Sequence, residues 1–70
     1  MTEKMNHILE RILSEELGRQ DAWLEEDRSM GFDVSNRKSA IDEIHEFMMT
    51  NDISIRQDFY YSAYHTKKRA

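Results

Sequence analysis

Apolar side chains recur at every third or fourth position near the start of the chain, and this spacing constrains the fold more than any other feature. The row comprises Met5, Ile8, Leu9, Ile12, Leu13 and Leu17. Such spacing places side chains on one face of an α-helix. Leu24 extends the row with Trp23 beside it, so we predict a helix from about residue 3 to about residue 28, with Thr2 as its N-cap. Gly18 costs about 1 kcal/mol inside a helix and offers an alternative end. No proline or turn cluster accompanies it, which favours one long helix.

Two further helical segments follow a loop around Gly31. Apolar spacing predicts a helix over about 36–50, with Ser35 or Asn36 as its N-cap. Ser54 and Gln57 match the capping box of a third helix over about 54–67. The predicted fold class is therefore all-α, with three helices in a single small domain over residues 1–70. We expect 36–50 and 54–67 to pack together as a helical hairpin.

The chain lacks the devices with which small proteins usually reinforce a small core. It has no cysteine, which excludes a disulfide and a thiolate zinc site. Folding of a chain this short is close to balanced without such a device. The first helix would be roughly 39 Å long, more than two shorter helices readily cover. Both points favour a homodimer, with the Met5–Leu17 row serving as core or as the seam between two copies.

Composition also predicts where the protein resides. No apolar run approaches the roughly 20 residues needed to span a bilayer, and no apolar segment follows a basic start as in a secretory signal. Charged residues make up 34% of the chain and proline is absent, which is typical of a helix-rich globular protein. We expect a cytoplasmic protein with no membrane association.

Residues 53–70 differ from the rest of the chain in charge and aromatic content. They carry four bases and one acid, whereas residues 1–34 carry nine acids and four bases. Four of the seven aromatic side chains also lie there. We predict that Phe59 and Tyr60 face the core and that Tyr61 is exposed. The predicted partner-binding residues are Arg56, Tyr61, Tyr64, Lys67, Lys68 and Arg69, joined by Trp23, which is alternatively core or dimer seam.

Metal-binding and catalytic patterns are incomplete. His45-Glu46 begins like the H-E-x-x-H zinc motif, but position 49 is methionine, so the second imidazole is missing. The acids Asp21, Glu25, Glu26 and Asp27 are typical of a solvated helix face. We predict no catalytic residue, no metal and no cofactor, and hence no enzyme.

Nucleic-acid binding is the main alternative. Residues 40–69 can be aligned with a helix-turn-helix, in which Arg56, Gln57 and a tyrosine would read base edges or phosphates. The basic residues 67–69 would contact phosphates. The first 52 residues carry a net charge of −7 (thirteen acids, six bases), which would repel a polyanion.

The sequence therefore favours a non-catalytic regulator or inhibitor that binds a protein partner. Small accessory proteins with which viruses of bacteria take over their hosts have a similar size and character, which is an analogy of scale. An acidic surface could also occupy a partner's nucleic-acid-binding groove by mimicking its charge.

Overall fold

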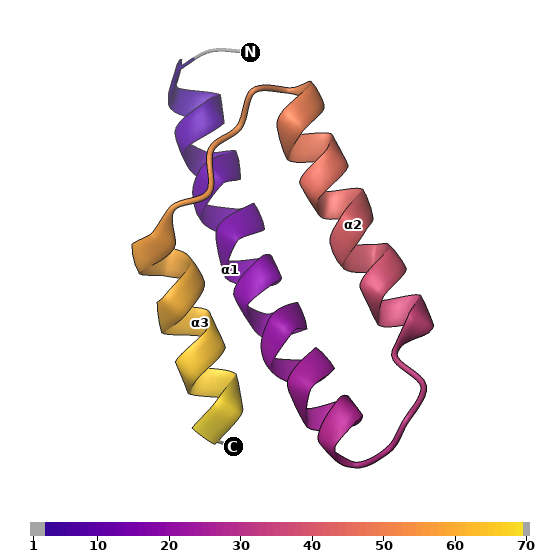
Figure 1. Ribbon diagram of the computed structural model, residues 1–70. Coiled ribbons are helices and arrows are strands. Elements are labelled where there is room, and N and C mark those ends of the chain that lie inside the picture. Colours follow the sequence, from indigo (N-terminus) through magenta and orange to yellow (C-terminus); the bar gives the residue numbers. More distant parts are fainter. Residues whose placement is uncertain (1–2, 70) are drawn as a thin grey trace.

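Three helices make up the computed structural model, which describes residues 3–69 of the chain and the side chains of residues 4–66 (Figure 1). Helix α1 spans Glu3–Ser29, α2 spans Ser35–Thr50 and α3 spans Gln57–Arg69. No strand occurs among these described residues. The all-α prediction is confirmed. The predicted N-cap of the first helix, Thr2, lies outside the described part.

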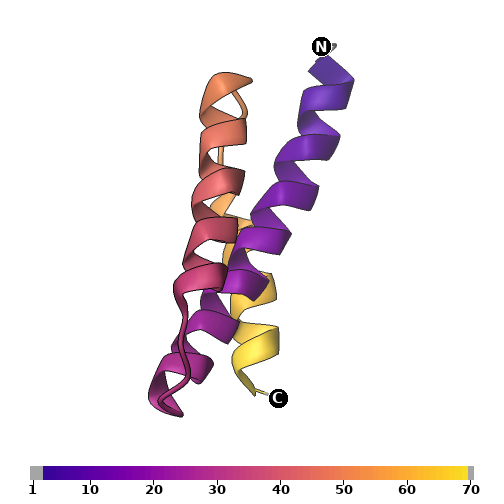
Figure 2. The same ribbon diagram turned by 90° about the vertical axis from the view of Figure 1, so that its right-hand side faces the viewer.

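Helix α1 lies between α2 and α3, so the predicted helical hairpin is wrong in its packing. Both α2 and α3 pack against α1, and the described residues show no direct packing of α2 on α3. Residues 51–56 cross over α1 to join them (Figure 1). The helices form one twisted layer with extents of 42 × 23 × 11 Å, in which α1 is tilted against its neighbours (Figure 2). The hairpin prediction assumed that helices adjacent in sequence pack on each other. The six-residue connection is long enough to cross α1, so α3 packs on the other side of it.

Helix α1 continues through Gly18, as the long-helix prediction required. The reason for the glycine is a close approach to α3. A Cβ at position 18 would lie 2.2 Å from the backbone oxygen of Tyr60 and 3.0 Å from the backbone nitrogen of Tyr64. Ser14 and Ala22, one turn before and after, are also buried and small. We call Ser14, Gly18 and Ala22 the small-residue row; it lets the two helix backbones come close together.

Helix α3 begins at Gln57, three residues later than predicted. The predicted capping box of Ser54 and Gln57 is not the start, because the first turn is anchored from α1 instead. The backbone N–H of Arg56 donates to the hydroxyl of Ser14 (2.8 Å), and the Arg56 carbonyl accepts from the N–H of Tyr60 (2.9 Å). Ser14 is fully buried, and this hydrogen bond provides its polar group with a partner.

The N-terminus of α2 does not use the predicted N-cap residues Ser35 and Asn36, and Asp33 accepts its hydrogen bonds instead. Val34 occupies the N-cap position with no side-chain hydrogen bond. Asp33 accepts from both the backbone N–H (3.0 Å) and the hydroxyl (2.7 Å) of Ser35. These hydrogen bonds hold the pKa of the Asp33 carboxyl below its ordinary value. In the loop before it, Gly31 has a φ of 82°, as expected for a turn glycine.

The hydrophobic core lies mainly between α1, α2 and the start of the crossing segment. Its buried residues are Leu17, Ile41, Met48 and Ile53, flanked by Leu9, Leu13, Leu24, Ile44 and Tyr60. The apolar row of α1 is therefore divided. Leu9, Leu13 and Leu17 face this core, whereas Met5, Ile8 and Ile12 remain 45–51% exposed.

Candidate functional site

Two open hollows meet along the side of α3 and together form what we call the aromatic groove. One is lined by Asp21, Leu24, Glu25, Tyr60, Tyr61 and Tyr64. The other is lined by Asp21, His45, Ile55, Gln57, Tyr60 and Tyr61. Asp21, Tyr60 and Tyr61 belong to both, so they lie at the centre. The groove draws its lining from all three helices and the crossing segment.

Helical spacing on α3 gathers the tyrosines of the groove. Tyr60 and Tyr64 are one turn apart and their rings stack at 6.2 Å, while the rings of Tyr60 and Tyr61 form a T-shaped pair at 5.1 Å. His65 stacks on Tyr61 at 6.1 Å. Tyr61 is 51% exposed, as predicted, and Tyr64 is partly buried. A half-exposed ring held among other rings offers a rigid surface at low entropic cost.

Asp21 joins the tyrosines to α1. The hydroxyl of Tyr60 donates a hydrogen bond to the Asp21 carboxylate. Burial raises the pKa of Tyr60 above its ordinary value, and the negative charges of Asp21 and Glu25 raise it further. Tyr60 therefore stays neutral as a donor, and the carboxylates of Asp21 and Glu25 line the groove beside it.

Arg56 does not join the aromatic groove. It lies over α1, where its guanidinium is within 3.8 Å of Glu10 and 3.7 Å of Asp58 and within 3.4 Å of the His7 ring. Its guanidinium also sits 5.5 Å from the centre of the Phe59 ring.

Phe59 is less buried than predicted. It is partly exposed and contacts two guanidinium groups, that of Arg56 at 5.5 Å and that of Arg11 at 5.3 Å from its ring centre. The small-residue row brings α3 so close to α1 that Tyr60, rather than Phe59, reaches the core.

Trp23 lies where α1 meets the start of α2, away from the other predicted partner-binding residues. The guanidinium of Arg37 is 5.3 Å from its ring centre. Arg37 also binds Asp27 (3.1 Å) and Gln20 (2.9 Å). Asp21 and Asp27 thus have structural partners, so the prediction of a purely solvated acidic face was wrong for both.

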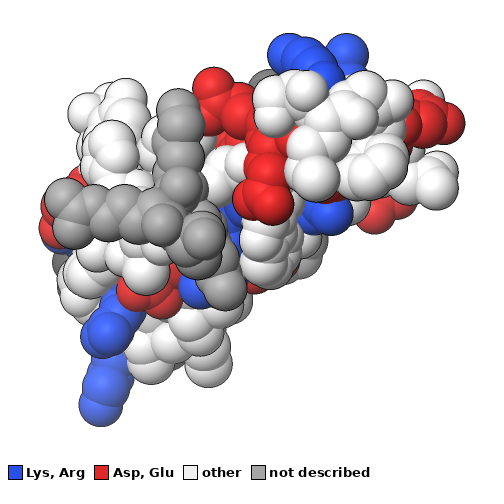
Figure 3. Space-filling model, turned by 90° about the horizontal axis from the view of Figure 1, so that it is seen from below, with Lys and Arg blue, Asp and Glu red and all other residues white. Residues whose placement is uncertain are grey.

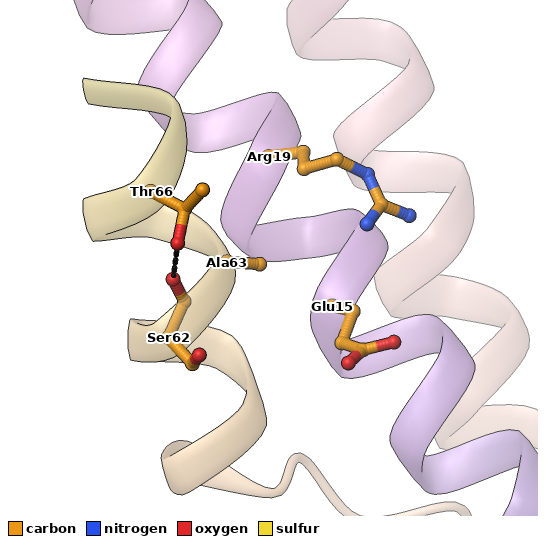
Figure 4. A pocket seen from close by; sticks show the side chains of 5 residues that line it. All are labelled: Glu15, Arg19, Ser62, Ala63 and Thr66. Atoms are coloured by element: carbon orange, nitrogen blue, oxygen red, sulfur yellow. Dashed lines mark hydrogen bonds between the residues drawn. The ribbon is translucent and has the colours of Figure 1, made fainter. Parts of the chain in front are cut away.

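A third hollow, on the other flank of α3, is polar and carries no comparable chemistry (Figure 4). It is lined by Glu15, Arg19, Ser62, Ala63 and Thr66. Its charged side chains extend away from α3 and have partners within α1: Glu15 pairs with Arg11 and Arg19 with Glu16. Thr66 donates to the Ser62 carbonyl (2.8 Å).

The side chains of the predicted residues Lys67, Lys68 and Arg69 lie outside the described part of the structure. Their backbone forms the last turn of α3, beside the C-terminal half of α1 (Figure 1). Seen from this end, the described acidic and basic side chains are interspersed (Figure 3).

Sequence reasoning selected Tyr61 and Tyr64 but missed Asp21, Tyr60, His45 and Ile55 as groove residues. One signal was available. Ser14, Gly18 and Ala22 recur every four residues, and a row of small residues indicates a close helix contact. That contact places Asp21 beside whatever helix packs there.

Comparison with protein-family models, with curated proteins and with solved structures gives no match. Over the described residues, none of the helices combines the length and apolar character that crossing a bilayer requires. Within the same residues, no three or more His, Cys, Asp or Glu side chains are grouped as a metal centre needs.

Proposed function

We propose that this chain is a small, non-catalytic cytoplasmic regulator that binds another protein through its aromatic groove. The observation that carries the proposal is the exposure of Tyr61 at the centre of a groove built from all three helices. Tyrosine is among the residues most enriched at binding hot spots, which lie in concave or well-packed surroundings. Tyr64 and Ile55 extend the same surface.

The helix-turn-helix alternative has less support. In that motif two successive helices pack on each other at about 90–120°, whereas α2 and α3 lie on opposite sides of α1. Arg56, the proposed base reader, is engaged by Glu10 and Asp58. The groove itself presents Asp21 and Glu25, which repel phosphates.

Site-specific photocrosslinking in the source organism tests the proposal. A photoreactive phenylalanine analogue replaces Tyr61 in one variant and Met49, which is exposed on α2, in the control. We expect one protein to crosslink at position 61 and not at position 49. The chain without the photoreactive residue should capture the same protein, and the double variant Tyr61→Ser/Tyr64→Ser should fail to capture it. Equal capture by that double variant would refute the groove as the binding surface. Salt-sensitive retention of random duplex DNA would favour the alternative instead.

We further propose that two copies associate through the exposed row of α1 formed by Met5, Ile8 and Ile12. Domains are usually built from two packed layers, whereas this chain forms one layer. The row lies opposite the groove residues of α1: at 100° per residue, Ile8 and Ile12 point about 140–180° away from Asp21. A dimer through this row would supply the second layer and leave the groove accessible.

Sedimentation across a hundredfold concentration range tests the dimer. We expect the wild-type chain to dimerise and Ile8→Lys/Ile12→Lys to remain monomeric, because four buried charges cannot be paired at such a seam. The matched control is Phe47→Lys/Met49→Lys on α2. A fully helical wild-type monomer at low micromolar concentration would refute the proposal.

A further inference from the structure

Three arginine side chains of the described residues share one environment, an aromatic ring beside a carboxylate. Arg37 lies over Trp23 and binds Asp27. Arg56 lies over Phe59 and is close to Glu10 and Asp58. Arg11 also lies over Phe59 and is near Glu15. A guanidinium suits such a site because it stacks on a ring and binds a carboxylate through its planar fork.

The aromatic groove contains the same two components without a guanidinium. Tyr60 and Tyr61 supply rings, Asp21 supplies a carboxylate next to them, and no lysine or arginine is among the described lining residues. From this arrangement we propose that the groove receives an arginine side chain of the partner, stacked on Tyr61 and bound to Asp21.

The geometry favours arginine over a purely apolar anchor. The hydroxyl of Tyr60 occupies only part of the hydrogen-bonding capacity of Asp21, since a carboxylate has two acceptor oxygens. The Asp21 carboxylate lines both hollows of the groove, so its charge faces the same space as the tyrosine rings. An apolar anchor would bury this carboxylate without neutralising it, whereas a guanidinium neutralises it and still covers the ring.

The proposal rests on the proposed function for the identity of the occupant, but it is tested on the isolated chain. The probes are two blocked tripeptides, acetyl-Gly-Arg-Gly-amide and its citrulline analogue, which has nearly the same shape and no charge. Each is titrated into the isotopically labelled protein, and the backbone amide signals of Asp21, Tyr61 and Tyr64 are followed by NMR. We expect the arginine peptide to bind in the millimolar range and the citrulline peptide at least about fivefold more weakly.

Variants test whether the arginine peptide binds the Tyr61 ring and the Asp21 carboxylate. Tyr61→Leu removes the ring but keeps apolar bulk, and Asp21→Asn removes the charge but keeps a hydrogen-bond acceptor for Tyr60. Each should weaken the arginine peptide roughly three- to tenfold. Tyr61→Phe keeps the ring and should leave the affinity within about twofold. Met49→Leu, on the exposed side of α2, is the matched control, and circular dichroism confirms that each variant keeps its helices.

The outcomes separate this inference from the proposed function. Equal binding of both peptides, or signal changes confined to residues outside the groove, would overturn the arginine site. So would no binding of the arginine peptide up to about 50 mM. If the partner nevertheless crosslinks at position 61, the groove is an interface of another chemistry. If the arginine peptide binds as expected but no protein crosslinks there, the site stands and the proposed function fails.

Discussion

The two sides of α1 are packed in opposite ways. Towards α2, the contact consists of large apolar side chains around Leu17, Ile41 and Met48, with the Arg37 cluster at the far end. Towards α3, the contact consists of the small-residue row against the backbone of Tyr60 and Tyr64, with hydrogen bonds from Arg56 and Tyr60. The first contact depends on large side chains that fill the space between the helices. The second depends on small side chains that let the two backbones approach each other.

This difference predicts opposite responses to changes in size. Removing atoms should weaken the α2 side, because a cavity remains where side chains interlocked. Adding atoms should weaken the α3 side, because the backbones already touch. The same helix thus has one side that tolerates small residues poorly and another that requires them.

Met48→Ala should have the largest effect. Met48 is 2% exposed, and truncating such a side chain costs about 3 kcal/mol of unfolding free energy. Urea unfolding followed by circular dichroism measures it. Met49→Ala is the control, because the neighbouring side chain is 83% exposed and should change stability by less than about 0.5 kcal/mol. Similar losses for both variants would show that α2 does not dock on this face.

Gly18→Ala should have the next largest effect, and the sign of the change in unfolding free energy decides between two opposing contributions. Helix propensity alone would stabilise the chain by about 1 kcal/mol. The 2.2 Å approach to the Tyr60 carbonyl should outweigh this and give a net loss of about 2 kcal/mol. The same denaturation assay applies, with Ser39→Ala on the exposed side of α2 as the propensity control. A net gain would mean that α1 and α3 are not in backbone contact.

Ser14→Ala should cost about 1–2 kcal/mol, because the Arg56 N–H loses its acceptor while its surroundings stay buried. The local readout is amide hydrogen exchange, which should accelerate at Arg56 and Tyr60 more than in α2. Ser62→Ala, on the exposed side of α3, is the comparison. Unchanged exchange at Arg56 would show that the start of α3 is held by something other than Ser14.

Arg37→Met should have the smallest effect. The variant keeps a long side chain over Trp23 but removes the contacts with Asp27 and Gln20. The side chains of Arg37 and Asp27 are each 29% exposed, so solvent screens the pair, and the loss of unfolding free energy should stay below about 1 kcal/mol. A double-mutant cycle with Asp27→Asn isolates the pair itself. A coupling energy above about 2 kcal/mol would show that this polar cluster, rather than the apolar core, is the main contact that stabilises α2 on α1.

The helices could be predicted from the sequence because apolar spacing is a local property, and the extents of α1 and α2 agree closely with it. Their arrangement could not, because it depends on fits between distant positions. Gly18 was interpreted as a possible helix end, whereas its role is set by Tyr60. The start of α3 was assigned to Ser54 from a local motif, whereas a serine 42 residues earlier than Arg56 supplies the partner.

The candidate site shows the same division. Tyr61 and Tyr64 could be selected from residue type and spacing alone. Asp21 was not selected, because the small-residue row beside it indicates a close helix contact but does not say which side chain of the other helix lies there. Its distinction comes from the hydroxyl of Tyr60, 39 residues away. Trp23 was selected by residue type, and the structure places it with Arg37 outside the groove.

The central position of α1 also sets the order in which the molecule can open. Over the residues that the structure describes, α2 packs on α1 and not on α3, so it can detach while the α1–α3 pair stays closed. Native proteins often open in such cooperative units, and amides in the detachable unit exchange with solvent first. Amide protons of α2 should therefore exchange faster than those in the middle of α1. Opening of that kind would uncover the His45 end of the aromatic groove while leaving its tyrosines in place.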